Sequence, residues 1–67
     1  MGEALKAARE AAGLSQSQLA NKSGVNVRII QHYEQGFKDI NKAAVVTVLK
    51  LAEALECEVK DIINPAE

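Results

Sequence analysis

The sequence predicts a compact all-α domain of five helices. Its 67 residues make one domain at most, 1–67, and 48% hydrophobic with 25% charged residues is a globular composition rather than a disordered one. The chain is rich in alanine, leucine, glutamate, lysine and glutamine and has only one proline, so intrinsic propensity favours helices. Apolar periodicity and capping residues place these helices at about 3–12, 16–23, 27–35, 42–55 and 59–63.

The first predicted helix, 3–12, is amphipathic. Leu5, Ala8 and Ala12 make a narrow apolar stripe along it. Gly13 follows directly and can adopt the left-handed conformation that commonly ends a helix. We therefore expect this helix to pack on the rest of the domain through one side only.

Two short helices with strong start signals follow. Ser15 and Gln18 have the spacing of a capping box, which predicts the start of the helix at 16–23. Asn26 is a favourable N-cap for the helix at 27–35. Each helix therefore begins at a side chain that can accept a hydrogen bond from its first turn.

The connection between these two helices is too short for them to lie side by side. Gly24 can take the left-handed conformation that ends the first of them. Small Ala20 lets the second helix cross closely, and branched Ile30 fills the angle between them. Two helices that cross steeply at a tight glycine turn form a helix-turn-helix.

The fourth predicted helix, 42–55, is expected to start at the N-cap Asn41 and is unusually apolar. Val46 and Leu51 fall outside its expected inward face. They are either ordinary exposed apolar residues or part of a subunit interface. The residues that fit the inward face are Val45, Val48, Leu49, Ala52 and Leu55. A short fifth helix at 59–63 follows, and Pro65 is expected to end the ordered structure.

The net charge of −1 is unevenly distributed. Residues 11–42 contain four basic and two acidic side chains, whereas residues 43–67 contain two basic and five acidic ones. The positive part of the chain is therefore the part with the helix-turn-helix. This surface can face phosphates, but it is only mildly basic, so we expect DNA affinity to need a second subunit.

Several classes of protein are disfavoured by the composition. The charged first ten residues argue against a secretory signal, and no apolar run reaches membrane-spanning length. Cys57 is the single cysteine and cannot form an internal disulfide, which fits a reducing cytoplasm. We expect no cofactor, no metal site and no enzymatic activity, because no catalytic constellation or glycine-rich phosphate loop is present.

In several places at fixed spacing, the chain resembles the phage repressor/Cro-type helix-turn-helix family (XRE family). The resemblance extends over nearly the whole length and implies a lambda-repressor-like domain whose second and third helices form the helix-turn-helix. The segments that carry it are Leu5, Arg9, Gly13-Leu14-Ser15-Gln16, Leu19-Ala20, Gly24-Val25, Ile30, Tyr33-Glu34-x-Gly36, Leu49-x-x-Ala52-x-x-Leu55 and Val59-x-x-Ile62-Ile63.

The resemblance also implies two structural features. Arg9 and Glu34 stand at positions where family members pair an arginine with a glutamate, and this ion pair would fix the first helix against the third. Glu56 stands where the family usually has a glycine. The fourth helix is therefore expected to end differently or with backbone strain.

The third helix is the expected DNA-reading element. Val25, Ile30 and Tyr33 point inward, so the opposite face is available to a major groove, and Arg28 matches the O6 and N7 atoms of guanine best. Apolar, branched Val27 and Ile29 instead suggest a protein-binding patch if both are exposed. The expected base contacts are Val27, Arg28, Gln31 and His32. The expected phosphate or helix-positioning contacts are Gln16, Asn26, Gln35, Lys38 and Lys42.

The functional hypothesis is a sequence-specific transcriptional regulator, expected to be a repressor, that binds a palindromic operator in double-stranded DNA as a homodimer. Leu51, Ile62 and Ile63 are the expected dimer interface. The protein is expected in the cytoplasm, associated with the nucleoid when bound to DNA. The alternative is a protein-interaction module, such as the antitoxin of a toxin–antitoxin pair, which can also bind its own promoter.

Overall fold

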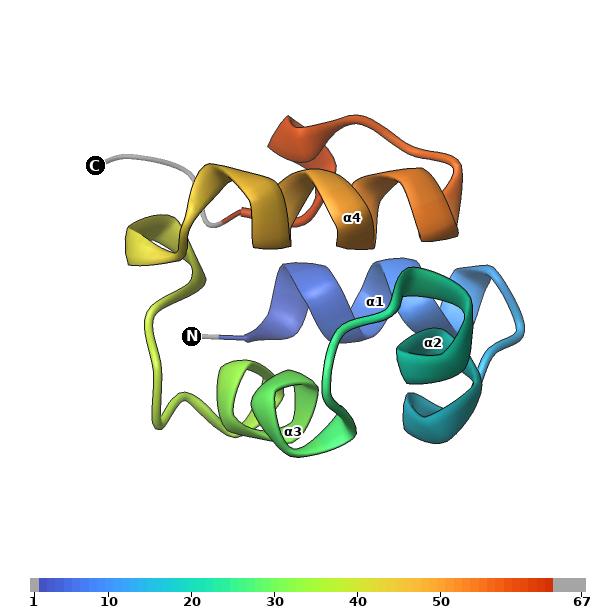
Figure 1. Cartoon of the computed structure of the whole chain (residues 1–67), viewed down its shortest axis with the longest axis horizontal. Coiled ribbons are helices and arrows are strands. Elements are labelled where there is room, and N and C mark those ends of the chain that lie inside the picture. Colours follow the sequence, from blue (N-terminus) through green and yellow to red (C-terminus); the bar gives the residue numbers. More distant parts are fainter. Residues whose placement is uncertain (1, 64–67) are drawn as a thin grey trace.

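The computed structural model describes residues 2–63, which form four α-helices and two short 3-10 turns (Figure 1). The prediction of an all-α fold is confirmed. The prediction of a fifth helix at 59–63 is wrong, because a 3-10 turn of three residues, Val59–Asp61, is found there instead. The expectation about Pro65 lies outside the described residues. In chain order the elements are α1 (Glu3–Ala11), α2 (Gln16–Ser23), α3 (Val27–Gln35), η1 (Ile40–Lys42), α4 (Val45–Leu55) and η2 (Val59–Asp61).

The helices pack around α1 and α2. In Figure 1, α4 runs along one side of the molecule, α3 lies on the opposite side, and α1 is between them. Helix α2 contacts both α3 and α4, while α1 contacts α3 and η2. This arrangement leaves the outer side of α3 open to a partner.

The core is aliphatic and draws on every element. Its six fully buried large side chains come one each from the four helices, from η1 and from the residue that follows η2. Such a core makes each element depend on the others, because none of them can bury its apolar side alone. The six residues are Leu5, Leu19, Ile30, Ile40, Leu51 and Ile62.

The expected dimer interface is therefore wrong at two of its three positions. Leu51 and Ile62 are 0% exposed, so neither can contact a second subunit. Ile63 is half-buried and packs against the core cluster. The sequence pattern misplaced Leu51 because α4 is turned so that its Leu51 side, not its Leu49 side, faces the core.

The start and inward face of α4 also differ from the prediction. Asn41 does not cap α4, since its backbone amide instead donates to the Asp39 side chain at 2.9 Å, which caps η1. Helix α4 begins at Val45, three residues after its predicted start at residue 42. The 3-10 turn places Ile40 in the core, and the chain must then extend before a helix can start. Val45 and Leu49, expected inside, are exposed.

The other helix ends follow the sequence signals closely. The Ser15–Gln18 capping box is present, with Gln18 N donating to Ser15 Oγ at 3.0 Å and Ser15 N donating to Gln18 Oε1 at 2.8 Å. Gly24 has a φ of 77° and ends α2 as predicted. The first helix ends one residue earlier than predicted, and Ala12 is exposed rather than part of the apolar stripe.

Candidate nucleic-acid interface

The first turn of α3 presents an exposed cation on a capped helix end. The Asn26 side chain caps α3 by accepting a hydrogen bond from Arg28 N at 2.8 Å. Arg28 itself is exposed, whereas Val27 and Gln31 are half-buried. Ile30 and Tyr33 are buried on the opposite side of the helix. The backbone is therefore fixed by the cap and the core, while the side chain of Arg28 is directed outward.

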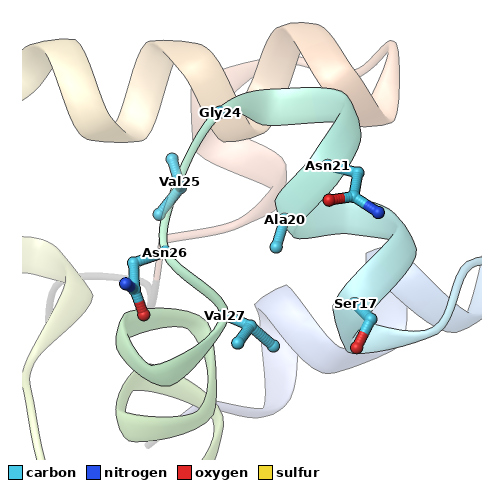
Figure 2. A pocket seen from close by; sticks show the side chains of 7 residues that line it. All are labelled: Ser17, Ala20, Asn21, Gly24, Val25, Asn26 and Val27. Atoms are coloured by element: carbon cyan, nitrogen blue, oxygen red, sulfur yellow. The ribbon is translucent and has the colours of Figure 1, made fainter.

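A shallow groove separates this turn from α2 (Figure 2). Figure 2 shows the Val27 side chain extending from the start of α3 towards α2, with Ala20 and Ser17 along the facing side. Both polar and apolar side chains line the groove, which suits contact with a sugar–phosphate backbone. The lining residues are Ser17, Ala20, Asn21, Gly24, Val25, Asn26 and Val27.

The far end of α3 is held by a partly buried hydrogen-bond network. Arg9 donates from Nε to Glu34 Oε2 at 2.7 Å and from Nη2 to Glu34 Oε1 at 3.0 Å. Gln16 Nε2 donates to the same Oε1 atom at 3.0 Å. The Gln16 side chain therefore braces α3 from the first turn of α2. The contact is compatible with the helix-positioning role that the sequence suggested for Gln16.

The charges near α3 favour an anionic partner. Arg9 neutralises Glu34, and Lys22 lies 3.6 Å from Glu56 in an exposed ion pair. Within residues 2–63, no ion pair involves Arg28 or Lys38. These two cations, on α3 and directly after it, are thus available to phosphates or bases.

The remaining predicted contact residues are spread along α3 and beyond it. Gln35 is exposed in the last turn, and His32 is half-buried with its ring edge against Phe37, the ring centroids being 6.0 Å apart. Lys42 is exposed, but it belongs to η1, which lies beside the start of α4 in Figure 1. Lys42 is therefore not part of the surface formed by α2 and α3.

Sequence reasoning missed Ser17 and Asn21. Both are exposed on α2 and line the groove opposite Val27 (Figure 2). Neither side chain has a hydrogen-bond partner among residues 2–63. Their spacing of four residues, which places them on one side of a helix, was the available signal. They add two neutral hydrogen-bond donors next to the cationic first turn of α3.

Comparison with known proteins agrees with this geometry. A family model described as helix-turn-helix matches residues 5–62. The crystal structure of the restriction-modification controller protein C.AhdI from Aeromonas hydrophila is similar, with 37% sequence identity, a TM-score of 0.79, and coverage of 90% of this chain and 86% of that one. No curated protein matches the chain. The chain belongs to the phage repressor/Cro-type helix-turn-helix family (XRE family).

Members of this family are DNA-binding transcription regulators, and this helix-turn-helix protein is one of them. The described part of the regulator contains no helix long and apolar enough to cross a membrane. Between residues 2 and 63 there is also no group of three or more His, Cys, Asp or Glu side chains that could hold a metal ion.

Proposed function

We propose that this regulator is a repressor that binds a palindromic operator as a homodimer and inserts α3 into the major groove. The unpaired, exposed Arg28 in the capped first turn of α3 is the observation that carries the proposal. Arg28 is assigned to guanine, since its planar guanidinium can bond both O6 and N7. Val27 is assigned to a thymine methyl group and Gln31 to an adjacent base.

Phosphate contacts complete the proposed complex on both sides of the groove. The first backbone amides of α2 have no intrahelical carbonyl to donate to, and the Ser17 hydroxyl beside them has no partner among residues 2–63. Asn21 and the side-chain NH2 of Asn26 extend the same surface. Lys38 follows α3 at its other end. We infer that these groups orient the domain on the duplex, while the α3 side chains read the sequence.

The proposed dimer uses an apolar surface on the α4 side of the domain. Three large apolar side chains of α4 are exposed there, and two of them, Val45 and Leu49, line an apolar groove together with Ile63. An isologous contact through this surface would remove it from water and relate the two α3 helices by two-fold symmetry. The three exposed residues, here called the apolar surface, are Val45, Val46 and Leu49.

The decisive experiment is selection from a random duplex DNA pool at about 0.15 M salt, followed by sequencing. The proposal predicts enrichment of an inverted repeat whose half-site centres lie about one helical turn, roughly 34 Å, apart. A pool without enrichment would refute specific DNA recognition by this regulator. Enrichment of a single half-site without an inverted repeat would refute the dimer but retain the assignment of α3.

The apolar surface also supports a second candidate function, binding of a protein partner in the manner of an antitoxin. Val27 and Ile29 on α3 give this candidate less support, because both are half-buried and Ile29 packs against the core. Affinity purification from the source cell tests this candidate. It predicts a stoichiometric partner that is lost from a Leu49→Lys variant, whereas recovery of the regulator alone would reject it.

A further inference from the structure

The start of α1 is packed directly against the backbone of the last turn of α3. Gly2 is buried, although it is the residue that precedes the first helix. A Cβ atom at Gly2 would lie 2.5 Å from Glu34 Cα and 2.7 Å from Glu34 C, and closer still to the Tyr33 carbonyl oxygen. Side chains at this position are thus excluded by backbone atoms, which cannot rotate out of the way.

Close approach, rather than backbone conformation, is what requires glycine here. Gly2 has φ −136° and ψ 13°, and its negative φ does not demand glycine. Its carbonyl oxygen accepts a hydrogen bond from Lys6 N at 3.1 Å, so this residue also begins α1. The start of α1 and the end of α3 are therefore held in one contact, here called the glycine seat, formed by Gly2, Tyr33 and Glu34.

Helix α1 holds Glu34 from two directions. At the start of α1, Gly2 lies against the Glu34 backbone in the glycine seat. From the last turn of α1, Arg9 binds the Glu34 carboxylate, which also accepts a bond from Gln16. The backbone contact leaves no room for adjustment, whereas the ion pair is made by long side chains that can follow a moving partner. The glycine seat therefore constrains the last turn of α3 more rigidly than the ion pair does.

Any shift at the glycine seat is transmitted along α3. Arg28 and Glu34 are six residues apart on one rigid helix, about 9 Å along its axis. To bring an alanine Cβ at Gly2 into ordinary contact, the start of α1 and the last turn of α3 must separate by about 1 Å. Good hydrogen-bond distances span a range of only roughly 0.5 Å, so this separation exceeds what a base contact tolerates. Base contacts from α3 would then be lost. Contacts from flexible lysines to phosphates would persist.

We propose that Gly2 is a positioning residue for sequence-specific recognition by this regulator, acting through the glycine seat. This inference rests on the proposed function, since it assigns base reading to α3. Gly2 touches no DNA in this proposal. It fixes the depth and tilt of α3 in the major groove, so its replacement lowers the preference for operator over scrambled DNA rather than DNA affinity in general.

The test compares Gly2→Ala with Gly13→Ala, each bound to the selected operator and to a scrambled duplex. Gly13 is a matched control because its φ of 73° makes alanine strained there, while the added Cβ meets nothing within 4 Å. Gly2→Ala is expected to reduce the operator-to-scrambled affinity ratio at least about tenfold, with affinity for scrambled DNA within about twofold of wild type. Gly13→Ala is expected to keep the wild-type ratio even if it melts earlier.

Equal losses on operator and scrambled DNA, or an unchanged ratio in Gly2→Ala, would overturn the inference. Backbone amide NMR shifts give a second readout without DNA: Gly2→Ala should move the α3 amides as far as Arg28, and Gly13→Ala should not. If wild type itself shows no operator preference, the proposed function fails, and these shifts still test the glycine seat.

If Gly2→Ala does not melt cooperatively, Arg9→Lys replaces it as the test. This variant keeps the charge at the Glu34 carboxylate but loses the two-pronged contact, and it leaves the glycine seat intact. The inference predicts that Arg9→Lys keeps an operator-to-scrambled affinity ratio within about threefold of wild type, although it melts at a lower temperature. A tenfold loss would show that the ion pair, not the glycine seat, positions α3.

Discussion

Arg9 and Glu34 form a two-pronged, largely buried ion pair that joins α1 to α3. Their side chains are 11% and 3% exposed, and the shorter of the two bonds measures 2.7 Å. The pKa of Arg9 is raised, chiefly by its hydrogen bond to Glu34. A raised arginine pKa means that the stabilising charge is present at all pH values below the ordinary arginine pKa and is lost only in stronger alkali.

We predict that Arg9→Met destabilises the regulator by about 3 kcal/mol, because it leaves the Glu34 carboxylate buried without its cation. Urea unfolding at pH 7 measures the loss. The double variant Arg9→Met with Glu34→Leu is the control, since replacing a whole buried pair by apolar side chains is often neutral. A double variant no more stable than Arg9→Met would contradict the assigned cause.

Glu56→Gly is expected to stabilise the regulator. Glu56 ends α4 with φ 55° and ψ 43°, the left-handed conformation in which a side chain costs about 1 kcal/mol. Relief of this strain should raise the melting temperature by about 4–8 °C in thermal unfolding. The exposed ion pair between Glu56 and Lys22 contributes little to stability, so losing it should not offset the gain from relieved strain.

Two controls separate strain from charge at Glu56. Lys22→Ala removes the ion pair alone and should leave the melting temperature nearly unchanged. Glu56→Ala removes the charge but keeps a Cβ, so it should not be stabilising. If Glu56→Ala gains as much as Glu56→Gly, the strain at this position is not the cause.

Arg28→Ala should weaken operator binding by about 1–3 kcal/mol and relax the preference at one base pair per half-site. Fluorescence anisotropy on the operator and on single-base variants measures both effects. Lys50→Ala is the control, because Lys50 is exposed on α4, which lies on the opposite side of α1 from α3. This variant also removes one positive charge and should leave the base preference intact. Identical preference profiles for wild type and Arg28→Ala would exclude this arginine as a base contact.

Leu49→Lys is expected to convert the proposed dimer into a monomer. Leu49 is 45% exposed within the apolar surface, and a two-fold contact there would oppose two like charges. Analytical ultracentrifugation should show a shift from the dimer to the monomer mass, with weaker operator binding. Ala11→Lys is the matched control, because Ala11 is exposed on α1, outside the apolar surface, and this variant should keep the dimer mass. A wild-type mass for Leu49→Lys would place the interface elsewhere.

The Cys57 thiol should react slowly in the folded state. Burial raises its pKa, and the charges of Asp61 and Glu58 raise it further. The stability linked to the neutral thiol is complete below the ordinary thiol pKa and is lost as the pH rises through the raised value. Alkylation with iodoacetamide at pH 8 should therefore be several-fold slower in the native protein than in concentrated urea. Equal rates would contradict this.

Local signals in the sequence were sufficient for the helix-turn-helix. The predicted bounds of α2 and α3 agree with the structure, because each end is set by a neighbouring residue: the Ser15 capping box, the Asn26 cap and a left-handed glycine. The exposed side of α3, including Arg28, follows from helical periodicity once these ends are fixed. The Arg9–Glu34 contact, in contrast, came from the family resemblance.

Sequence periodicity failed where burial depends on distant elements. Helix α4 carries apolar residues on more than one side, so its pattern did not identify which side faces inward. The packing of α2 and η2 against it buried Leu51 and left Leu49 in solvent. In the same way, burial of Ile40 in the core places Asn41 within η1, so α4 begins further along the chain and Asn41 does not cap it.

The sequence by itself determined α2 and α3, their caps and the exposed cationic first turn of α3, since these depend on residues within a few positions of one another. Only the tertiary structure decided the outward side of α4, the groove opposite Val27 and the contact of Gly2 with the end of α3. Each of these joins segments that are remote in the chain. Their positions result from the joint packing of all the elements around one core, which no local pattern encodes.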